Sequence, residues 1–97
     1  MNVGALRVRF RLPENGSLKG KRRVIKSLTT RVTGRFNVSV AEIDDLDEWR
    51  LATLGFVCVS NDRRHLDEIL SRLMSFIELN RGDAEILDYE TEIINLL

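Results

Sequence analysis

The sequence predicts an α+β fold in which two helices cover one face of a four-stranded antiparallel sheet. Two observations carry this prediction. Polar and apolar residues alternate in segments 2–12 and 84–94, as in half-buried strands, whereas segments 17–35 and 62–79 repeat their apolar residues with helical spacing. Two more strand-like runs, 36–43 and 49–60, flank the polar residues 44–48, which indicates a hairpin between them. The order of elements is therefore β-α-β-β-α-β.

The first strand is followed by a helix with clear start and stop signals. The strand turns its basic residues to the side opposite its apolar ones: Arg7, Arg9 and Arg11. Pro13 ends the strand, and Ser17 is a suitable N-cap for the helix. We expect this helix to run to about Arg35, with Gly34 ending it in a left-handed conformation. Its apolar stripe consists of Leu18, Ile25, Leu28 and Val32.

The second half of the chain repeats this pattern. Asn61 or Asp62 is expected to cap the second helix, which residues 80–83 then end. The apolar residues of that helix fall on one face: Leu66, Ile69, Leu70, Leu73 and Ile77. With right-handed crossovers, this order of elements gives a single ferredoxin-like domain over residues 1–97, an α/β plait with strand order 4-1-3-2.

The charges are strongly segregated although the net charge is zero. Residues 1–40 contain ten basic residues and one acid, a net charge of +9, and residues 41–97 contain five basic residues and fourteen acids, a net charge of −9. In the predicted sheet the last strand lies beside the first, and its outward residues are expected to be Ile86, Asp88, Glu90 and Glu92. The three acids of that set are therefore expected to form a cross-strand charge ladder with Arg7, Arg9 and Arg11.

The first helix carries the cations that the ladder does not explain. A helix N-terminus has a partial positive charge, so cations there are unfavourable unless an anion offsets them. We identify a candidate RNA- or anion-binding surface in Lys19, Lys21, Arg22, Arg23 and Lys26, with Arg31 and Arg35 adding to its positive field. The alternative is a solvated charged face with no ligand.

The third strand indicates a second candidate surface. One of its faces carries Leu54, Phe56 and Cys58, and the other carries Thr53, Val57 and Val59. Whichever set packs on the helices, the other leaves apolar surface on the open face of the sheet, which is typical of an interface. Thr53, Val57 and Val59 are therefore the candidate contacts of a homodimer.

The sequence offers little for catalysis, and we expect a protein that is not an enzyme. It has no nucleotide-binding glycine motif, one histidine (His65) and one cysteine (Cys58) expected to be buried and unreactive. The acids at 44–48 match no calcium loop, so we expect neither a metal nor a cofactor. No segment is apolar enough to span a membrane, and the lone cysteine fits a cytoplasmic protein.

Three strings, SLKGKRRVIKSL, RFNVSVAEID and LGFVCVSND, together resemble the YlxP-like family of small bacterial proteins of unknown function. The resemblance covers residues 3 to about 79. It implies a ferredoxin-like fold, and the genomic setting of the family among translation and ribosome maturation factors implies a ribosome-associated role. We therefore expect a cytoplasmic accessory protein that binds ribosomal RNA or the small ribosomal subunit. The alternative is a homodimeric protein–protein interaction module that binds no nucleic acid.

Overall fold

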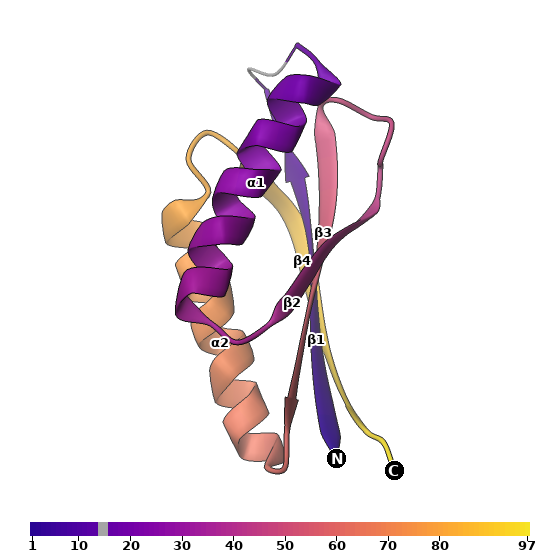
Figure 1. The fold of residues 1–97 in the computed structure, drawn as a ribbon, viewed down its shortest axis with the longest axis vertical. Helices are drawn as coiled ribbons and strands as arrows, with labels where there is room; N and C mark the ends of the chain where they lie inside the picture. The colour runs from indigo at the N-terminus through magenta and orange to yellow at the C-terminus, as the bar shows by residue number, and fades with distance from the viewer. Residues whose placement is uncertain (14–15) are drawn as a thin grey trace.

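The computed structural model describes residues 1–13 and 16–97, and it has the predicted order of elements (Figure 1). The strands are β1 (Asn2–Arg11), β2 (Ser39–Asp44), β3 (Leu51–Ser60) and β4 (Glu85–Asn95), and the helices are α1 (Leu18–Arg35) and α2 (Arg63–Asn80). The antiparallel sheet has the order β2-β3-β1-β4, which is the predicted order read from the other edge. Both helices lie on the same side of this sheet. The predicted ferredoxin-like α+β fold is confirmed.

The core lies between the sheet and the two helices. On the central pair of strands, Leu6 lies opposite Phe56 and Val8 opposite Leu54, and all four side chains are buried. The helices complete the core with Leu28 and Val32 of α1 and with Leu66, Leu70, Leu73 and Ile77 of α2. Each such side chain contributes about 1.5–3 kcal/mol when it leaves water, which is why the two periodicities in the sequence determine the fold.

Helix α1 begins as predicted but ends differently. The backbone N–H of Gly20 donates to the Ser17 hydroxyl at 3.0 Å, which confirms Ser17 as the N-cap. The prediction of a left-handed cap at Gly34 is wrong, because Gly34 lies inside the helix. The chain passes directly into extended backbone at Phe36 (φ −127°), whose N–H donates to the Val32 carbonyl at 2.8 Å. The left-handed glycine is instead Gly82 (φ +60°), in the turn between α2 and β4.

Strand β4 contains an irregularity that the alternation did not predict. Arg9 is paired with Asp88, but the next residue, Phe10, is paired with Ile86, so Leu87 is an extra residue. The bulge turns Ile86 inward, where it packs against the core, and the prediction that Ile86 faces outward is wrong. It also brings Glu85 opposite Arg11.

Candidate nucleic-acid interface

Helix α1 presents a cluster of cations that no acid of the helix balances. Its 18 residues include seven Lys or Arg and no Asp or Glu. Four of these cations lie on the face opposite the core and are exposed, and we call them the basic face: Lys19, Arg22, Arg23 and Lys26. None of the four forms an ion pair with a residue of segments 1–13 or 16–97. Their charges therefore face the solvent along the first half of α1, and Lys19 and Arg22 lie nearest to the positive end of the helix dipole.

The two remaining predicted contributors lie on the side of α1 that faces α2. The guanidinium carbon of Arg35 lies 5.4 Å from the centre of the Phe76 ring, so this cation stacks on an aromatic side chain of the second helix. Arg31 lines a pocket between α1 and the turn before β4. Both side chains are exposed, but they belong to a different stripe of the helix from the basic face.

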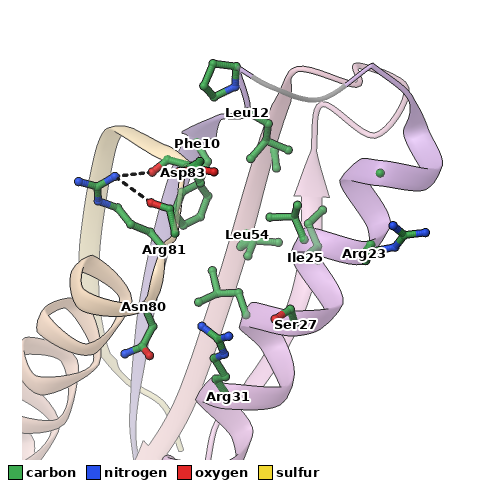
Figure 2. Close-up of a pocket in the computed structure, with 17 residues that line it drawn as sticks. Phe10, Leu12, Arg23, Ile25, Ser27, Arg31, Leu54, Asn80, Arg81 and Asp83 are labelled. Atoms are coloured by element: carbon green, nitrogen blue, oxygen red, sulfur yellow. Dashed lines mark hydrogen bonds between the residues drawn. The ribbon is translucent and has the colours of Figure 1, made fainter.

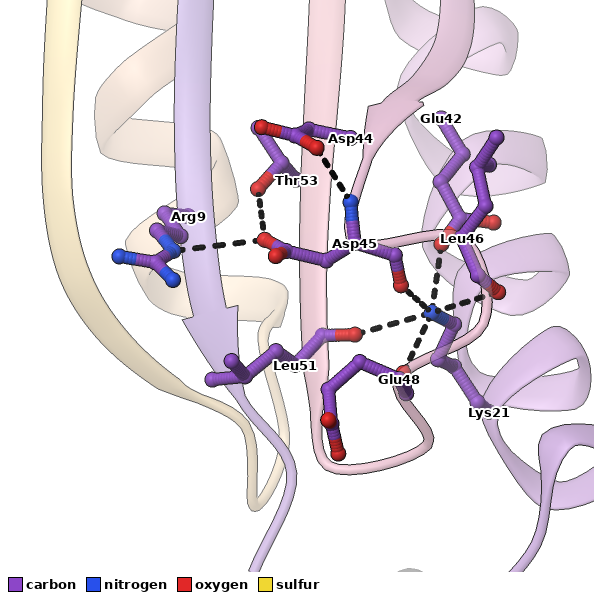
Figure 3. A network of polar contacts seen from close by, with 9 residues as sticks. All are labelled: Arg9, Lys21, Glu42, Asp44, Asp45, Leu46, Glu48, Leu51 and Thr53. Carbon is purple, nitrogen blue, oxygen red and sulfur yellow. Dashed lines mark hydrogen bonds and ion pairs between the residues drawn. The ribbon is translucent and has the colours of Figure 1, made fainter.

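Lys21 does not belong to this surface, and its assignment to an anion-binding site is wrong. The side chain is only 1% exposed, and its ammonium group lies within a ring of oxygens from the β2–β3 connection (Figure 3). The ammonium donates to the carbonyls of Asp45 (2.6 Å), Glu48 (2.7 Å) and Leu51 (2.9 Å), and that of Leu46 lies at 3.4 Å. An oxygen of Glu42 lies 2.7 Å from the same nitrogen. Because an ammonium has only three N–H bonds, we interpret the Glu42 contact as an ion pair.

The position of Lys21 within the apolar repeat of the helix indicates that it is buried. Lys21, Ile25, Leu28 and Val32 follow one another at i, i+4, i+7 and i+11, the spacing of a single buried helix face. A charged residue in the middle of such a stripe must find partners inside the protein, because an isolated buried charge is very unfavourable. Here those partners are backbone carbonyls. Every residue has a backbone carbonyl, so the sequence does not indicate which carbonyls will surround a lysine. For this reason the sequence alone groups Lys21 with the exposed cations of the helix.

Asp45 links the same connection to the sheet. Its carboxylate accepts hydrogen bonds from the Thr53 hydroxyl at 2.6 Å and from Arg9 Nε at 3.3 Å, while its carbonyl accepts from Lys21. The Thr53 hydrogen bond and the charge of Arg9 lower the pKa of Asp45, against the opposing effect of burial. Asp45 has a left-handed backbone (φ 60°), a conformation that aspartate tolerates better than most residues. Asp45 therefore attaches the β2–β3 connection to three elements, β1, β3 and α1.

The predicted charge ladder exists only in part. Arg7 pairs with Glu90 at 3.2 Å, as predicted. Arg9 pairs with Asp45 instead of Asp88, and Arg11 pairs with Glu85, which the bulge in β4 brings opposite it. Asp88 and Glu92 form no ion pair with any described residue and remain exposed on the edge strand.

The open face of the sheet differs from its predicted form at one residue. Val57 (42% exposed) and Val59 (60% exposed) are accessible, but Thr53 is only 4% exposed because Asp45 covers it. The prediction of Thr53 as an interface residue is therefore wrong. Ile43 lies over Gly55, where an added Cβ atom would come within 3.1 Å of it. A shallow groove of about 330 Å³ runs beside these residues.

Comparison with known proteins identifies the family of this chain. A family model described as "Protein of unknown function (DUF503)" matches residues 3–91. The chain belongs to this family. It is also 43% identical over 63 residues to "Uncharacterized protein YlxP" of Bacillus subtilis (strain 168), an alignment that covers 65% of this chain and 68% of that protein. The resemblance to the YlxP-like family is thus confirmed.

A solved structure extends the comparison of folds. SnoaB of Streptomyces nogalater, described as a cofactor-independent oxygenase, superposes on this YlxP-like chain with a TM-score of 0.51 and 11% sequence identity. The match covers 98% of this chain and 92% of SnoaB, and at this identity it shows a common fold alone. The prediction that the protein is not an enzyme is corrected by this neighbour. The prediction depended on missing metal and cofactor motifs, and an oxygenase described as cofactor-independent on this fold removes that ground for excluding catalysis.

Two reactive side chains of this YlxP-like protein lie in different environments. Cys58 is buried, and burial raises the pKa of its thiol, whereas His65 is exposed at the start of α2. Within residues 1–13 and 16–97, no three His, Cys, Asp or Glu side chains gather as they do around a metal ion. Neither helix in the described part of the chain is long and apolar enough to cross a membrane.

Proposed function

We propose that this protein is a cytoplasmic accessory protein that binds RNA, with ribosomal RNA of the small subunit as its target. The contact surface is the basic face of α1, and Arg31 and Arg35 strengthen its positive potential. The observation that supports this proposal is the absence of any acid from α1 together with four exposed cations that no described residue pairs. The genomic setting implied by the family resemblance supports ribosomal RNA as the target.

The structure around the basic face supports a ligand more than a solvated surface. The one buried cation of α1, Lys21, is neutralised inside the protein by a carboxylate and four carbonyls. Among the described residues the basic face has no such arrangement, although Lys21 fixes the acid-rich β2–β3 connection beside the first turns of α1. Cations at a helix start cost a few tenths of a kcal/mol each, and phosphate groups offset that cost. Contacts of this kind position a protein on RNA by shape more than by sequence.

The test is binding of the purified protein to isolated small ribosomal subunits across a salt series. We expect saturable binding whose logarithmic salt slope is about −3 to −4, because each neutralised phosphate contributes about −0.7 to −0.9. Arg22→Glu with Arg23→Glu should abolish this binding. The matched control is Arg64→Glu with Arg72→Glu, which changes the net charge equally on α2 and should bind like the unmodified protein.

Two results would overturn the RNA proposal. The first is absence of binding at low salt, where electrostatic attraction is strongest. The second is equal loss of binding in the α1 and α2 variants, because it would mean that net charge alone governs the association.

A second candidate function, a homodimeric interaction module, is favoured by a specific row of residues. Val59, Val3 and Ile94 lie side by side on β3, β1 and β4, and Val59 and Ile94 are exposed. Contiguous exposed apolar side chains on a sheet are typical of an interface. In this function the open face of the sheet pairs with the same face of a second copy.

Sedimentation equilibrium tests the dimer. A dimer that Val59→Lys converts to a monomer would support the sheet interface. A monomer at all concentrations, or a dimer that Val59→Lys leaves intact, would exclude it. Arg22→Glu with Arg23→Glu should leave the oligomeric state unchanged, so this experiment is independent of the RNA experiment.

A further inference from the structure

We propose that a pocket between α1 and the α2–β4 turn binds a small hydrophobic carboxylate. The pocket has a volume of about 460 Å³ and is lined by residues of β1, β3, α1, the last residue of α2 and the turn at residues 81–84 (Figure 2). This volume lies within the range of about 300–1,000 Å³ typical of small-molecule sites. The inference goes beyond the proposed RNA binding and does not depend on it.

The floor of the pocket is apolar. Its base consists of buried core side chains, among them Phe10 of β1 and Leu54 of β3. Val24 and Ile25 of α1 also line it and keep part of their surface exposed. Five of the lining residues are small: Gly20 and Ser27 on α1, Ala52 on β3, and Gly82 and Ala84 in the turn. Such a floor favours an apolar body and disfavours a strongly hydrated ion such as inorganic phosphate.

The mouth of the pocket is cationic. Its lining includes three arginines (Arg23, Arg31 and Arg81) and one acid, Asp83, a net charge of +2. Arg31 projects from α1 into the space between the two helices (Figure 2) and forms no ion pair with a described residue. Arg81 is engaged with the turn, since it donates to the Ala84 carbonyl at 2.8 Å. The Arg23 guanidinium points away from this space (Figure 2), so Arg31 is the one of the three lining arginines that is available to a ligand.

These two features together select the ligand class. A guanidinium beside an apolar surface binds a planar carboxylate through two parallel N–H···O hydrogen bonds. The carboxylate of the ligand would lie at Arg31, and its hydrocarbon or aromatic body would lie over Val24 and Ile25, whose side chains are partly exposed. Because one of the three lining arginines, Arg31, is both unengaged and turned into this space, we infer a ligand with a single carboxylate.

Decanoate and decanol, which share a hydrocarbon chain, are the probes for this site. We would titrate each into the isotope-labelled protein below its micelle concentration and follow backbone amide shifts. We expect saturable shifts confined to Val24, Ile25 and residues 80–84, with decanoate binding at least about tenfold more tightly than decanol. Ser27→Trp, at an exposed position on the pocket mouth, should weaken both probes by about tenfold or more.

A pair of charge-matched variants separates a specific contact from general attraction. Arg31→Gln should weaken decanoate about tenfold and leave decanol unchanged, whereas Lys26→Gln, outside the pocket, should leave both unchanged. Absence of saturable shifts, equal affinity for the two probes, or equal loss in the two variants would overturn the proposal. Ser27→Trp retains the basic face, so it should still bind ribosomal subunits if the RNA proposal holds. Failure of one proposal is therefore distinguishable from failure of the other.

Discussion

At the scale of single residues, a lysine in the middle of an apolar stripe has the largest structural effect. Lys21 has the same side chain as Lys19 and Lys26, yet it is enclosed by oxygens while they face water. The difference follows from helical position alone, which places Lys21 toward the sheet and the β2–β3 connection. Its charge is part of the interior, and its energetics are those of a buried ion pair.

Replacing Lys21 should strongly destabilise the fold. Lys21→Met would leave Glu42 and the surrounding carbonyls without their cation, and removing one partner of a buried pair costs about 3–5 kcal/mol. We expect the free energy of unfolding in urea to fall by about 3 kcal/mol. The matched control, Lys26→Met on the basic face, should change it by less than about 0.5 kcal/mol. Equal effects of the two substitutions would contradict the enclosed position of Lys21.

Asp45 should make part of the stability depend on acidity. Its pKa is lower in the folded protein than its usual value of 3.8, so folding favours the carboxylate. This contribution is complete above the unfolded value and is lost as the pH falls through the lower folded value. Asp45→Asn should therefore be less stable than the unmodified protein at neutral pH, and the difference should shrink below about pH 4. Unfolding curves at several pH values measure it, and a difference independent of pH would contradict the assignment.

At the scale of elements, alternation and helical spacing were sufficient to predict all four strands, both helices and their order. Each element buries one face, and burial imposes its period on the sequence. Two features had no such period. The extra residue Leu87 shifts β4 without changing its composition, and the oxygens around Lys21 are mostly backbone atoms. The basic face and the Arg7–Glu90 pair could be anticipated, because both depend on side chains alone.

The end of α1 provides a direct test at this scale. Gly34 lies in the helix with no atom within 4 Å of an added Cβ, so Gly34→Ala should stabilise the protein by about 0.5–1 kcal/mol. Gly82 also has open space around it, but its φ of +60° strains any side chain. Gly82→Ala should therefore destabilise the protein, as thermal unfolding would show. A loss of stability in Gly34→Ala would indicate a left-handed helix end after all.

At the scale of the whole molecule, a net charge of zero conceals two charged regions. The basic face lies on the helix layer, whereas the exposed acids Asp88, Glu90 and Glu92 lie on the edge strand β4. The molecule measures 43 × 23 × 20 Å, so even its shortest dimension exceeds a screening length of about 8 Å at physiological salt. A binding partner therefore interacts with the charge of the surface that it contacts, although the net charge of the protein is zero.

Ion-exchange chromatography should reveal this separation. Although the isoelectric point is about 6.6, we expect retention on a cation exchanger at pH 7 and low salt. Lys19→Glu with Lys26→Glu should abolish retention. Arg64→Glu with Arg72→Glu, which changes the total charge by the same amount on α2, should be retained. Identical elution of the two double variants would show that total charge decides the behaviour.

The contacts of Lys21 also place a natural fluorophore, Trp49, in the segment that is attached to α1. The connection that Lys21 fastens to α1 contains Trp49, the one tryptophan of the sequence, which is 41% exposed and stacks with Arg50. Because the Lys21 ammonium donates to carbonyls within residues 45–51, we expect a movement of the first turns of α1 to shift this backbone and the indole with it. We therefore expect an anion that settles on α1 to alter the emission of Trp49. Ligands can then be screened by intrinsic fluorescence, without an attached dye.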